Sequence, residues 1–160
     1  MHSSIKRLIV KAALPWAVRW VQQQEERVLK EGRPLTEWEM EWAADVSIER
    51  PEKVRVLEVN SVPTPGKLLT TLAEKLLRTF SFDATGMAVR YGIYLNVMHS
   101  QNPSLLVHEM AHVAQYERLG GIQPFLKRYL DECLEDGYWD SSLEREARKA
   151  AAPFPNAPSP

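Results

Sequence analysis

Hydrophobic residues recur every three to four positions through the first part of the chain, and this spacing predicts an amphipathic helix. Its apolar stripe comprises Ile5, Leu8, Ile9, Ala12, Trp16 and Trp20, and basic residues stand off the stripe. Pro15 lacks a backbone donor, so we expect it to kink the helix or to divide it in two. Packing of this helix on the domain core is the favoured interpretation, and a membrane-surface helix is the alternative.

Capping residues predict where further helices begin and end. Gly32 and Pro34 end the first unit, and Thr36 with Glu39 has the spacing of a capping box. The second helix would then carry Trp38, Trp42 and Val46. Later segments with helical spacing or good helix ends are Leu68–Phe80, a helix from Asn102-Pro103 to Gly120-Gly121, one from about Gln123 to Glu135, and a last one over Ser141–Ala151.

Two short segments have the composition of β-strands. Val54–Val59 is rich in β-branched residues and precedes turn-forming residues. Met87–Asn96 contains Gly92 in its middle, which predicts a hairpin or a bulged strand. The sequence therefore predicts an α+β domain that is mostly helical, with a short sheet or hairpin beside the helix that follows Asn102.

Composition limits the class of protein. The 160 residues are 44% hydrophobic and 26% charged, which is typical of one soluble globular domain. Lysine and arginine (20) nearly balance aspartate and glutamate (21), so no global field favours nucleic acid. Cys133 is the only cysteine, which excludes an internal disulfide and an all-thiolate zinc site, and a reducing compartment is the simpler expectation.

The expected organisation is a helical segment over 1–50 packed on a main domain over 51–152, followed by a disordered tail over 153–160. No apolar stretch reaches the roughly 18 to 20 residues that span a bilayer, and no signal peptide is recognisable. We therefore expect a cytoplasmic protein with no transmembrane segment; export by a specialised secretion system is compatible with this. The sequence does not predict an oligomeric state.

The segment LLVHEMAHVAQ, over 105–115, places three polar groups with the chemistry of a metal site in an apolar helix. His108 and His112 are four residues apart, so both imidazoles lie on one helical face, with Glu109 beside them. This is the HExxH arrangement, in which two histidines bind zinc and the glutamate acts as general base. The residues around the motif are Leu105, Leu106, Val107, Met110, Ala111, Val113 and Ala114.

Those apolar neighbours predict that the helix is largely buried. An unpaired buried polar group costs roughly 2 to 7 kcal/mol, so the three side chains need a common compensation, which a divalent cation supplies. The alternatives are a surface cluster of these side chains, or buried histidines satisfied by hydrogen bonds.

A catalytic zinc needs a third protein ligand, and no histidine follows His112. A carboxylate on the last predicted helix is the expected ligand, and Glu144 has rivals in Glu146, Glu135 and Asp136. Ser141 and Glu144 also have capping-box spacing, so Glu144 has an alternative role as a cap of its own helix.

The motif resembles the gluzincin metallopeptidases, and most closely the small peptidase-like core domain of bacterial contractile injection system proteins. That group has a His-Glu-x-x-His-Val-x-Gln helix, preceded by a strand pair with a glycine before Ile-Tyr. The resemblance extends over about Val54–Ala151. The matching residues here are Gly92, Ile93, Tyr94, His108, Glu109, His112, Val113 and Gln115.

The resemblance implies a zincin-like fold, a Zn²⁺ cofactor and a third ligand from a Glu-x-x-Ala-Asp pattern. Carried over to this chain, that pattern selects Glu144 with Ala147. Arg148 stands where relatives often have an acidic residue that orients a metal-binding histidine. The chain therefore departs from the family in the residues that hold the ligands in place.

The implied function is a zinc-dependent metallopeptidase that hydrolyses peptide bonds of a peptide or protein substrate, using a zinc-bound water activated by Glu109. Met87–Asn96 is a candidate sheet edge for binding an extended substrate. A donor to the developing oxyanion is also expected. The candidates are Tyr91, Tyr94, His99, Tyr116 and Tyr138.

A second hypothesis is a zinc-stabilised, catalytically inactive interaction or assembly module. Arg148 and the absence of a clear oxyanion donor favour this module. Glu109 favours the enzyme, because a purely structural zinc site needs no general base.

Overall fold

The computed structural model describes residues 3–64 and 85–154, and they form a small α+β domain. The predicted helix over Leu68–Phe80 and most of the predicted disordered tail lie outside the described residues. The elements are α1 (Ser3–Glu31), β1 (Arg33–Pro34), α2 (Glu37–Asp45), the 3-10 helix η1 (Pro51–Lys53), β2 (Arg55–Val59), β3 (Gly86–Val89), β4 (Gly92–Asn96), α4 (Pro103–Leu119), α5 (Ile122–Glu135) and α6 (Ser142–Ala151).

The strands form one mixed sheet in the order β1-β2-β4-β3. β3 and β4 are the predicted hairpin: they pair antiparallel with Val89 opposite Gly92. β2 is parallel to β4, with Arg55 opposite Gly92. The two-residue strand β1 was not predicted; it pairs antiparallel with β2 at one edge of the sheet, while β3 forms the other edge.

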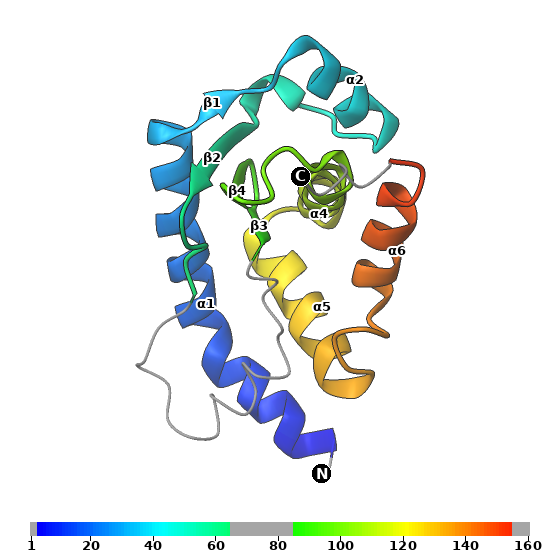
Figure 1. Cartoon of the computed structure of the whole chain (residues 1–160). Helices are drawn as coiled ribbons and strands as arrows, with labels where there is room; N and C mark the ends of the chain where they lie inside the picture. The colour runs from blue at the N-terminus through cyan, green and yellow to red at the C-terminus, as the bar shows by residue number, and fades with distance from the viewer. Residues whose placement is uncertain (1–2, 65–84, 155–160) are drawn as a thin grey trace.

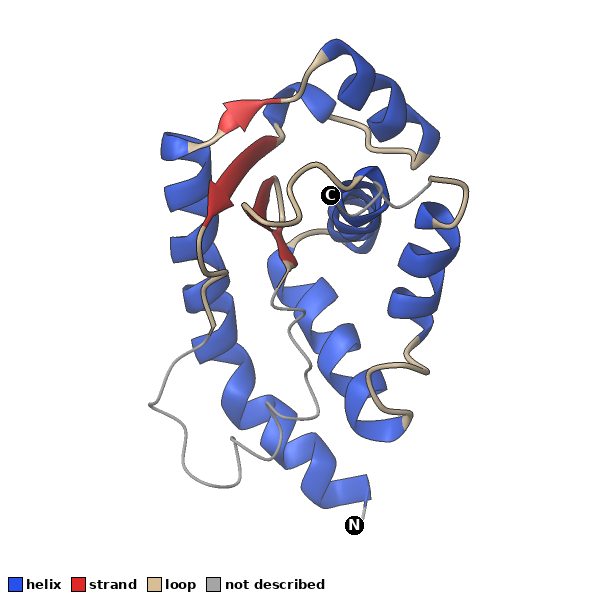
Figure 2. Cartoon of the chain, in the orientation of Figure 1, coloured by secondary structure: helices blue, strands red, loops and turns tan. Residues whose placement is uncertain are grey.

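Helices cover both faces of this sheet, with α1 on one side and α4 on the other (Figures 1 and 2). The alternation of side chains along β4 explains the arrangement. Tyr94 is fully buried toward α1, where its hydroxyl donates to Gln24 Oε1 over 3.0 Å. Ile93 and Leu95 belong to the hydrophobic cluster on the other face, together with Met110 of α4. The central strand is therefore buried on both faces.

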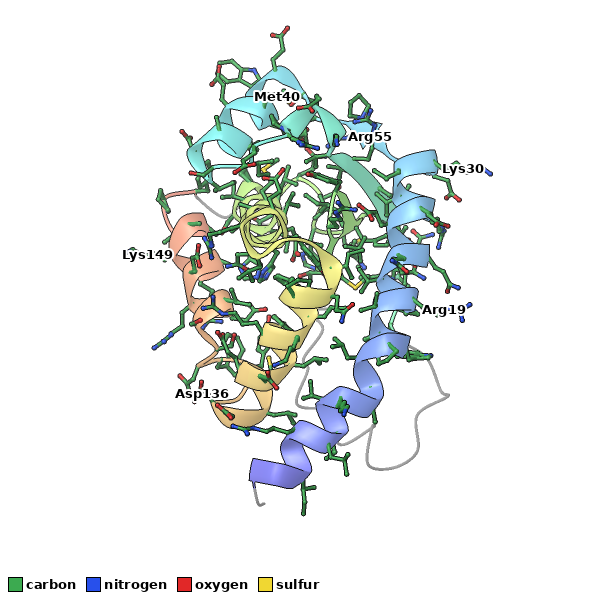
Figure 3. The ribbon with its side chains drawn as sticks, turned by 180° about the vertical axis from the view of Figure 1, so that it is seen from behind. Arg19, Lys30, Met40, Arg55, Asp136 and Lys149 are labelled. Atoms are coloured by element: carbon green, nitrogen blue, oxygen red, sulfur yellow. The ribbon has the colours of Figure 1, made fainter. Side chains whose placement is uncertain are left out.

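The N-terminal helix is continuous through Pro15, so the predicted division does not occur, although its axis changes direction along its length (Figure 1). Figure 3 shows Arg19 and Lys30 pointing away from the rest of the chain. No helix among the described residues has both the length and the apolar character needed to cross a membrane.

The buried face of α1 differs from the predicted stripe. Ile5 and Leu8 are 49% and 66% exposed, whereas Val10, Val21 and Val28 are buried. The partners of the helix decide this face, because Val10 packs with residues of α5 while Val21 and Val28 pack in the cluster that includes the sheet. Two overlapping sets of apolar residues on this helix have helical spacing, so the sequence pattern does not decide which set is buried. Contact with the sheet and α5 decides it.

Helix α4 has the predicted ends and carries the HExxH segment through the middle of the domain. Asn102 accepts hydrogen bonds from the first-turn amides, Pro103 occupies the first position, and Gly120 ends the helix with a φ of 95°. The predicted burial is confirmed, since every residue from Glu109 to Tyr116 is buried. α4 lies between the sheet and α6 and is seen almost end-on in Figure 1.

The start of α6 is held by Glu132 of α5. The Glu132 carboxylate accepts hydrogen bonds from the hydroxyls of Ser141 (3.0 Å) and Ser142 (2.7 Å) and from the amide of Leu143 (3.2 Å). A carboxylate near a helix N-terminus is also favoured by the helix dipole. Glu132 therefore sets the position of the helix that carries Glu144.

Substitution of Glu132 by glutamine should weaken this junction in a pH-dependent manner. Burial opposes ionisation, but hydrogen bonds from Arg128, Ser142, Leu143 and Ser141 outweigh it and lower the pKa of Glu132 from 4.5 to about 2. A lowered pKa contributes stability that is fully present above pH 4.5 and is lost as the pH falls toward 2. The difference in unfolding free energy between wild type and Glu132→Gln should therefore be constant from pH 7 to 5 and shrink toward pH 3.

Urea unfolding at each pH measures that difference, with Glu135→Gln as the matched control, because Glu135 is exposed on the same helix. A difference between wild type and Glu132→Gln that stays constant down to pH 3 would contradict the assignment.

Candidate metal centre

Three side chains from two helices converge in the interior of the domain: His108 and His112 of α4 and Glu144 of α6. The two Nε2 atoms are 3.2 Å apart. Glu144 Oε2 lies 3.3 Å from His108 Nε2, and Glu144 Oε1 lies 3.4 Å from His112 Nε2. One donor atom from each residue can be chosen so that all lie within 4.8 Å of one another.

These separations suit a zinc ion. Zinc binds histidine nitrogen and carboxylate oxygen at about 2.0–2.2 Å, so neighbouring ligands of a tetrahedral site lie about 3.3 Å apart. Nitrogen and oxygen ligands of this kind suit zinc and several other divalent transition metals. The donor set and its spacing therefore fit a divalent metal.

Gln115 determines which nitrogen of His112 faces this point. The side-chain amide of Gln115 donates from Nε2 to the carbonyl of Leu143 over 2.9 Å, which leaves Oε1 as an acceptor. His112 Nδ1 lies 2.8 Å from that oxygen, so Nδ1 carries the proton. In the neutral ring, the lone pair of His112 is then on Nε2 and faces His108 and Glu144.

Tyr129 of α5 holds the carboxylate of Glu144, because its hydroxyl donates to Oε1 over 2.7 Å. The other oxygen, Oε2, is buried, and no donor among the described residues reaches it with hydrogen-bond geometry. Arg148 Nη1 is 4.0 Å from it, beyond hydrogen-bond distance. A buried carboxylate oxygen without a donor is costly, and a bound cation would satisfy it.

The electrostatics of the centre favour a positive charge between these groups. Burial disfavours the charged form of His112, but the hydrogen bond and negative charge of Glu144 outweigh it and raise the pKa of His112 to about 9. Burial also opposes ionisation of Glu144, yet the close imidazoles of His108 and His112 hold the pKa of its carboxyl well below its usual range. A proton or a metal cation can supply this positive charge.

Glu109 is buried beside the centre, and Gly86 of β3 leaves room for its carboxylate. A Cβ atom at position 86 would lie 2.8 Å from Glu109 Oε1 and 3.1 Å from Glu109 Cγ. Those distances are too short for carbon against a buried side chain. The glycine thus allows the edge strand to pass directly over the glutamate.

A cavity of about 320 Å³ opens beside His108, whose side chain is 19% exposed, compared with 8% for His112 and 2% for Glu144. The group of converging donor atoms therefore faces this cavity through His108. The lining residues are Thr85, His99, Asn102, Ser104, Leu105, His108, Arg148, Ala151 and Ala152.

The rivals of Glu144 lie elsewhere. Glu146 pairs with Arg118 through two hydrogen bonds of 2.7 and 2.8 Å, and Glu135 and Asp136 are exposed and outside the group of converging donors. Ser141 accepts a hydrogen bond from the amide of Glu144, so the serine caps α6. The Glu144 side chain points instead at the histidines and Tyr129, away from a capping role.

Most of the predicted oxyanion donors are placed away from the cavity. The hydroxyl of Tyr91 donates to Glu117 Oε1, Tyr94 donates to Gln24, and Tyr116 stacks on Phe125 inside the core. Tyr138 does not line the cavity either. His99, from the loop between β4 and α4, is the member of that set that does line it.

Sequence reasoning missed the orienting roles of Gln115, Tyr129 and Glu132. Gln115 is part of the motif quoted above, and its position one helical turn after His112 could have predicted a contact between the two side chains. Tyr129 and Glu132 have no such signal, because their contacts depend on how α5 packs beside α6.

Comparisons of the chain with protein-family models, with curated proteins and with solved structures gave no match.

The geometry predicts different effects for two glutamates on the same helix. Glu144→Gln should weaken Zn²⁺ binding by at least about tenfold, because it replaces a charged oxygen ligand with a neutral amide. Glu146→Gln should leave binding within about twofold, because Glu146 pairs with Arg118 on the surface. Isothermal titration of the metal-free variants with Zn²⁺ measures both affinities, and equal losses, or a loss for Glu146→Gln alone, would refute the assignment of Glu144.

Proposed function

We propose that this protein is a zinc-dependent metallopeptidase whose metal ligands are His108, His112 and Glu144. The observation that carries the proposal is the convergence of two imidazole Nε2 atoms on a buried carboxylate, one oxygen of which accepts no hydrogen bond from the described residues. The cavity beside His108 supports a catalytic rather than a structural site, because catalytic zinc keeps one position open whereas structural zinc is closed by four protein ligands.

The chain's own residues divide the chemistry between them. A zinc ion in this place would supply Lewis acidity, which polarises a substrate carbonyl and makes a water more acidic. Glu109 takes a proton from the attacking water on a carboxylate oxygen and passes it to the leaving amine nitrogen. Gln115 and Tyr129 keep His112 and Glu144 in position by their hydrogen bonds.

The edge strand β3 is the candidate binding element for an extended substrate. It forms one edge of the sheet, and Gly86 at its start lies against Glu109. A peptide that pairs with this edge would place its backbone beside the general base. His99 lines the cavity beside His108 and is the candidate donor to the oxyanion.

The alternative is a zinc-binding interaction or assembly module without hydrolytic activity. Its main argument from the sequence was Arg148, which replaces an acidic residue expected to orient a histidine. In the structure Gln115 bonds to His112, so a charged partner at position 148 is not needed for that purpose. We therefore place the enzyme first.

Glu109→Gln separates the two functions. The variant should keep the fold and one zinc, because Glu109 is not among the proposed ligands and glutamine has nearly the same volume. Its rate of cleavage of a peptide library should fall by a factor of about 10² to 10⁴, because the amide cannot accept the proton. Rates of fluorogenic cleavage and zinc content are measured on the same preparations.

The matched control is Glu41→Gln, an exposed residue of α2, which should cleave at the wild-type rate. Wild-type cleavage must also disappear with a chelator and return with zinc. A wild type that binds zinc but cleaves nothing would support the module, and equal rates for wild type and Glu109→Gln would disprove the role of Glu109.

A further inference from the structure

We propose that the cavity beside His108 is a subsite for a carboxylate of the substrate, and that Arg148 is the residue that binds it. This inference rests on the proposed function for its place in catalysis, and it names the substrate class: peptides with a carboxylate next to the scissile bond. Arg148 and His108 line the same cavity.

The charges of the lining residues favour an anion. Among the described residues that line the cavity, none is a carboxylate, and Arg148 alone has a permanent charge. The remaining side chains are histidines, neutral polar groups or apolar groups. An anionic ligand in this cavity therefore meets a guanidinium, with no competing acidic side chain from the described part of the chain.

The two helix ends at the cavity do not change this balance. The amides of Ser104 and Leu105 at the start of α4 already donate to Asn102 Oδ1. The carbonyl of Ala151 at the end of α6 already accepts from the Ser104 hydroxyl and from the amide of Phe154. These groups are satisfied by the chain, so Arg148 is the group we expect to determine the sign of the ligand's charge.

Arg148 is held in place but retains donors for a ligand. Its Nη2 donates to the carbonyl of Trp139, and its guanidinium lies over the Trp139 ring at 5.2 Å from the centroid. Within the described part of the chain, its nearest carboxylate oxygen is Glu144 Oε2, 4.0 Å from Nη1. Arginine carries five N–H donors, so most remain available. A side chain already ordered in this way loses little entropy on binding.

The volume limits the ligand to a small group. About 320 Å³ is at the low end of ligand pockets, which suits one acidic side chain or one chain-terminal residue rather than a longer segment. Because His108 belongs to both the cavity and the metal centre, a carboxylate bound there lies within one residue or so of the bond to be cut. An acidic side chain and a chain-terminal residue would both present a carboxylate to Arg148.

Binding is tested first without metal and without catalysis. Glutarate is titrated into the metal-free full chain, and the Nε–H signal of Arg148 is followed by NMR, with neutral glutaramide as the comparison ligand. We expect a saturable shift for glutarate and none for glutaramide. Binding to the Arg148→Gln variant is followed through the backbone amide signals around the cavity, and glutarate should bind it at least about tenfold more weakly. The affinity of Arg148→Lys for glutarate should be intermediate, because lysine keeps the charge but not the planar fork.

Arg145→Gln is the matched control, because Arg145 is exposed on the same helix and its loss changes the net charge equally. It should bind glutarate as wild type does. Absence of saturable binding, equal binding of glutaramide, or equal binding by Arg148→Gln and Arg145→Gln each overturns the subsite.

Cleavage then tests its place in catalysis. One peptide set has an internal glutamate and an amidated C-terminus, a second has a free C-terminus and no acidic residue, and a third has neither. We expect wild type to prefer one of the first two sets by about tenfold over the third, and Arg148→Gln to lose that preference. Glutarate binding through Arg148 without any cleavage would refute the metallopeptidase and keep the subsite, whereas cleavage without preference and without glutarate binding would refute the subsite alone.

Discussion

The contact on which the rest of the structure depends is the one between the Glu144 carboxylate and the paired imidazoles of His108 and His112. A buried carboxylate is expensive unless it is paired, and an incomplete pairing is strongly destabilising. Both helices are fixed accordingly: α4 is buried against the sheet, and the start of α6 is held by Glu132 and Ser141. Small shifts of either helix would separate the donor atoms, so the site depends on the packing of α4 and α6.

The side chains that orient His112 and Glu144 are neutral. An amide, Gln115, fixes His112, and a hydroxyl, Tyr129, bonds to Glu144. Glu144 and Glu109 are then the negative charges that act on His112. Arg148 borders both the Glu144 carboxylate and the cavity, and this position is the basis for its proposed role in ligand choice.

Local signals in the sequence were sufficient for much of the fold. Asn102, Pro103 and Gly120 predicted the ends of α4 because caps depend on backbone groups close by in the chain. The convergence of the two histidines likewise follows from helical spacing. Contacts between distant elements were not predictable in this way: the buried face of α1, the strand β1 and the bond from Tyr129 to Glu144 depend on packing across the domain. Among the rival carboxylates, the family resemblance selected Glu144, whereas the capping pattern offered it a different role. Only the packing of α6 on α4 brings its carboxylate to the histidines.

The central claim is that His108, His112 and Glu144 bind one divalent metal ion, and metal content tests it most directly. Elemental analysis of protein purified without added metal, followed by analysis after titration with Zn²⁺ and removal of excess, gives the stoichiometry. The account predicts one zinc per chain, together with a rise in thermal stability on loading, because a metal that binds only the folded state stabilises it by mass action. Zinc well below one equivalent after titration, with an unchanged melting temperature, would contradict it.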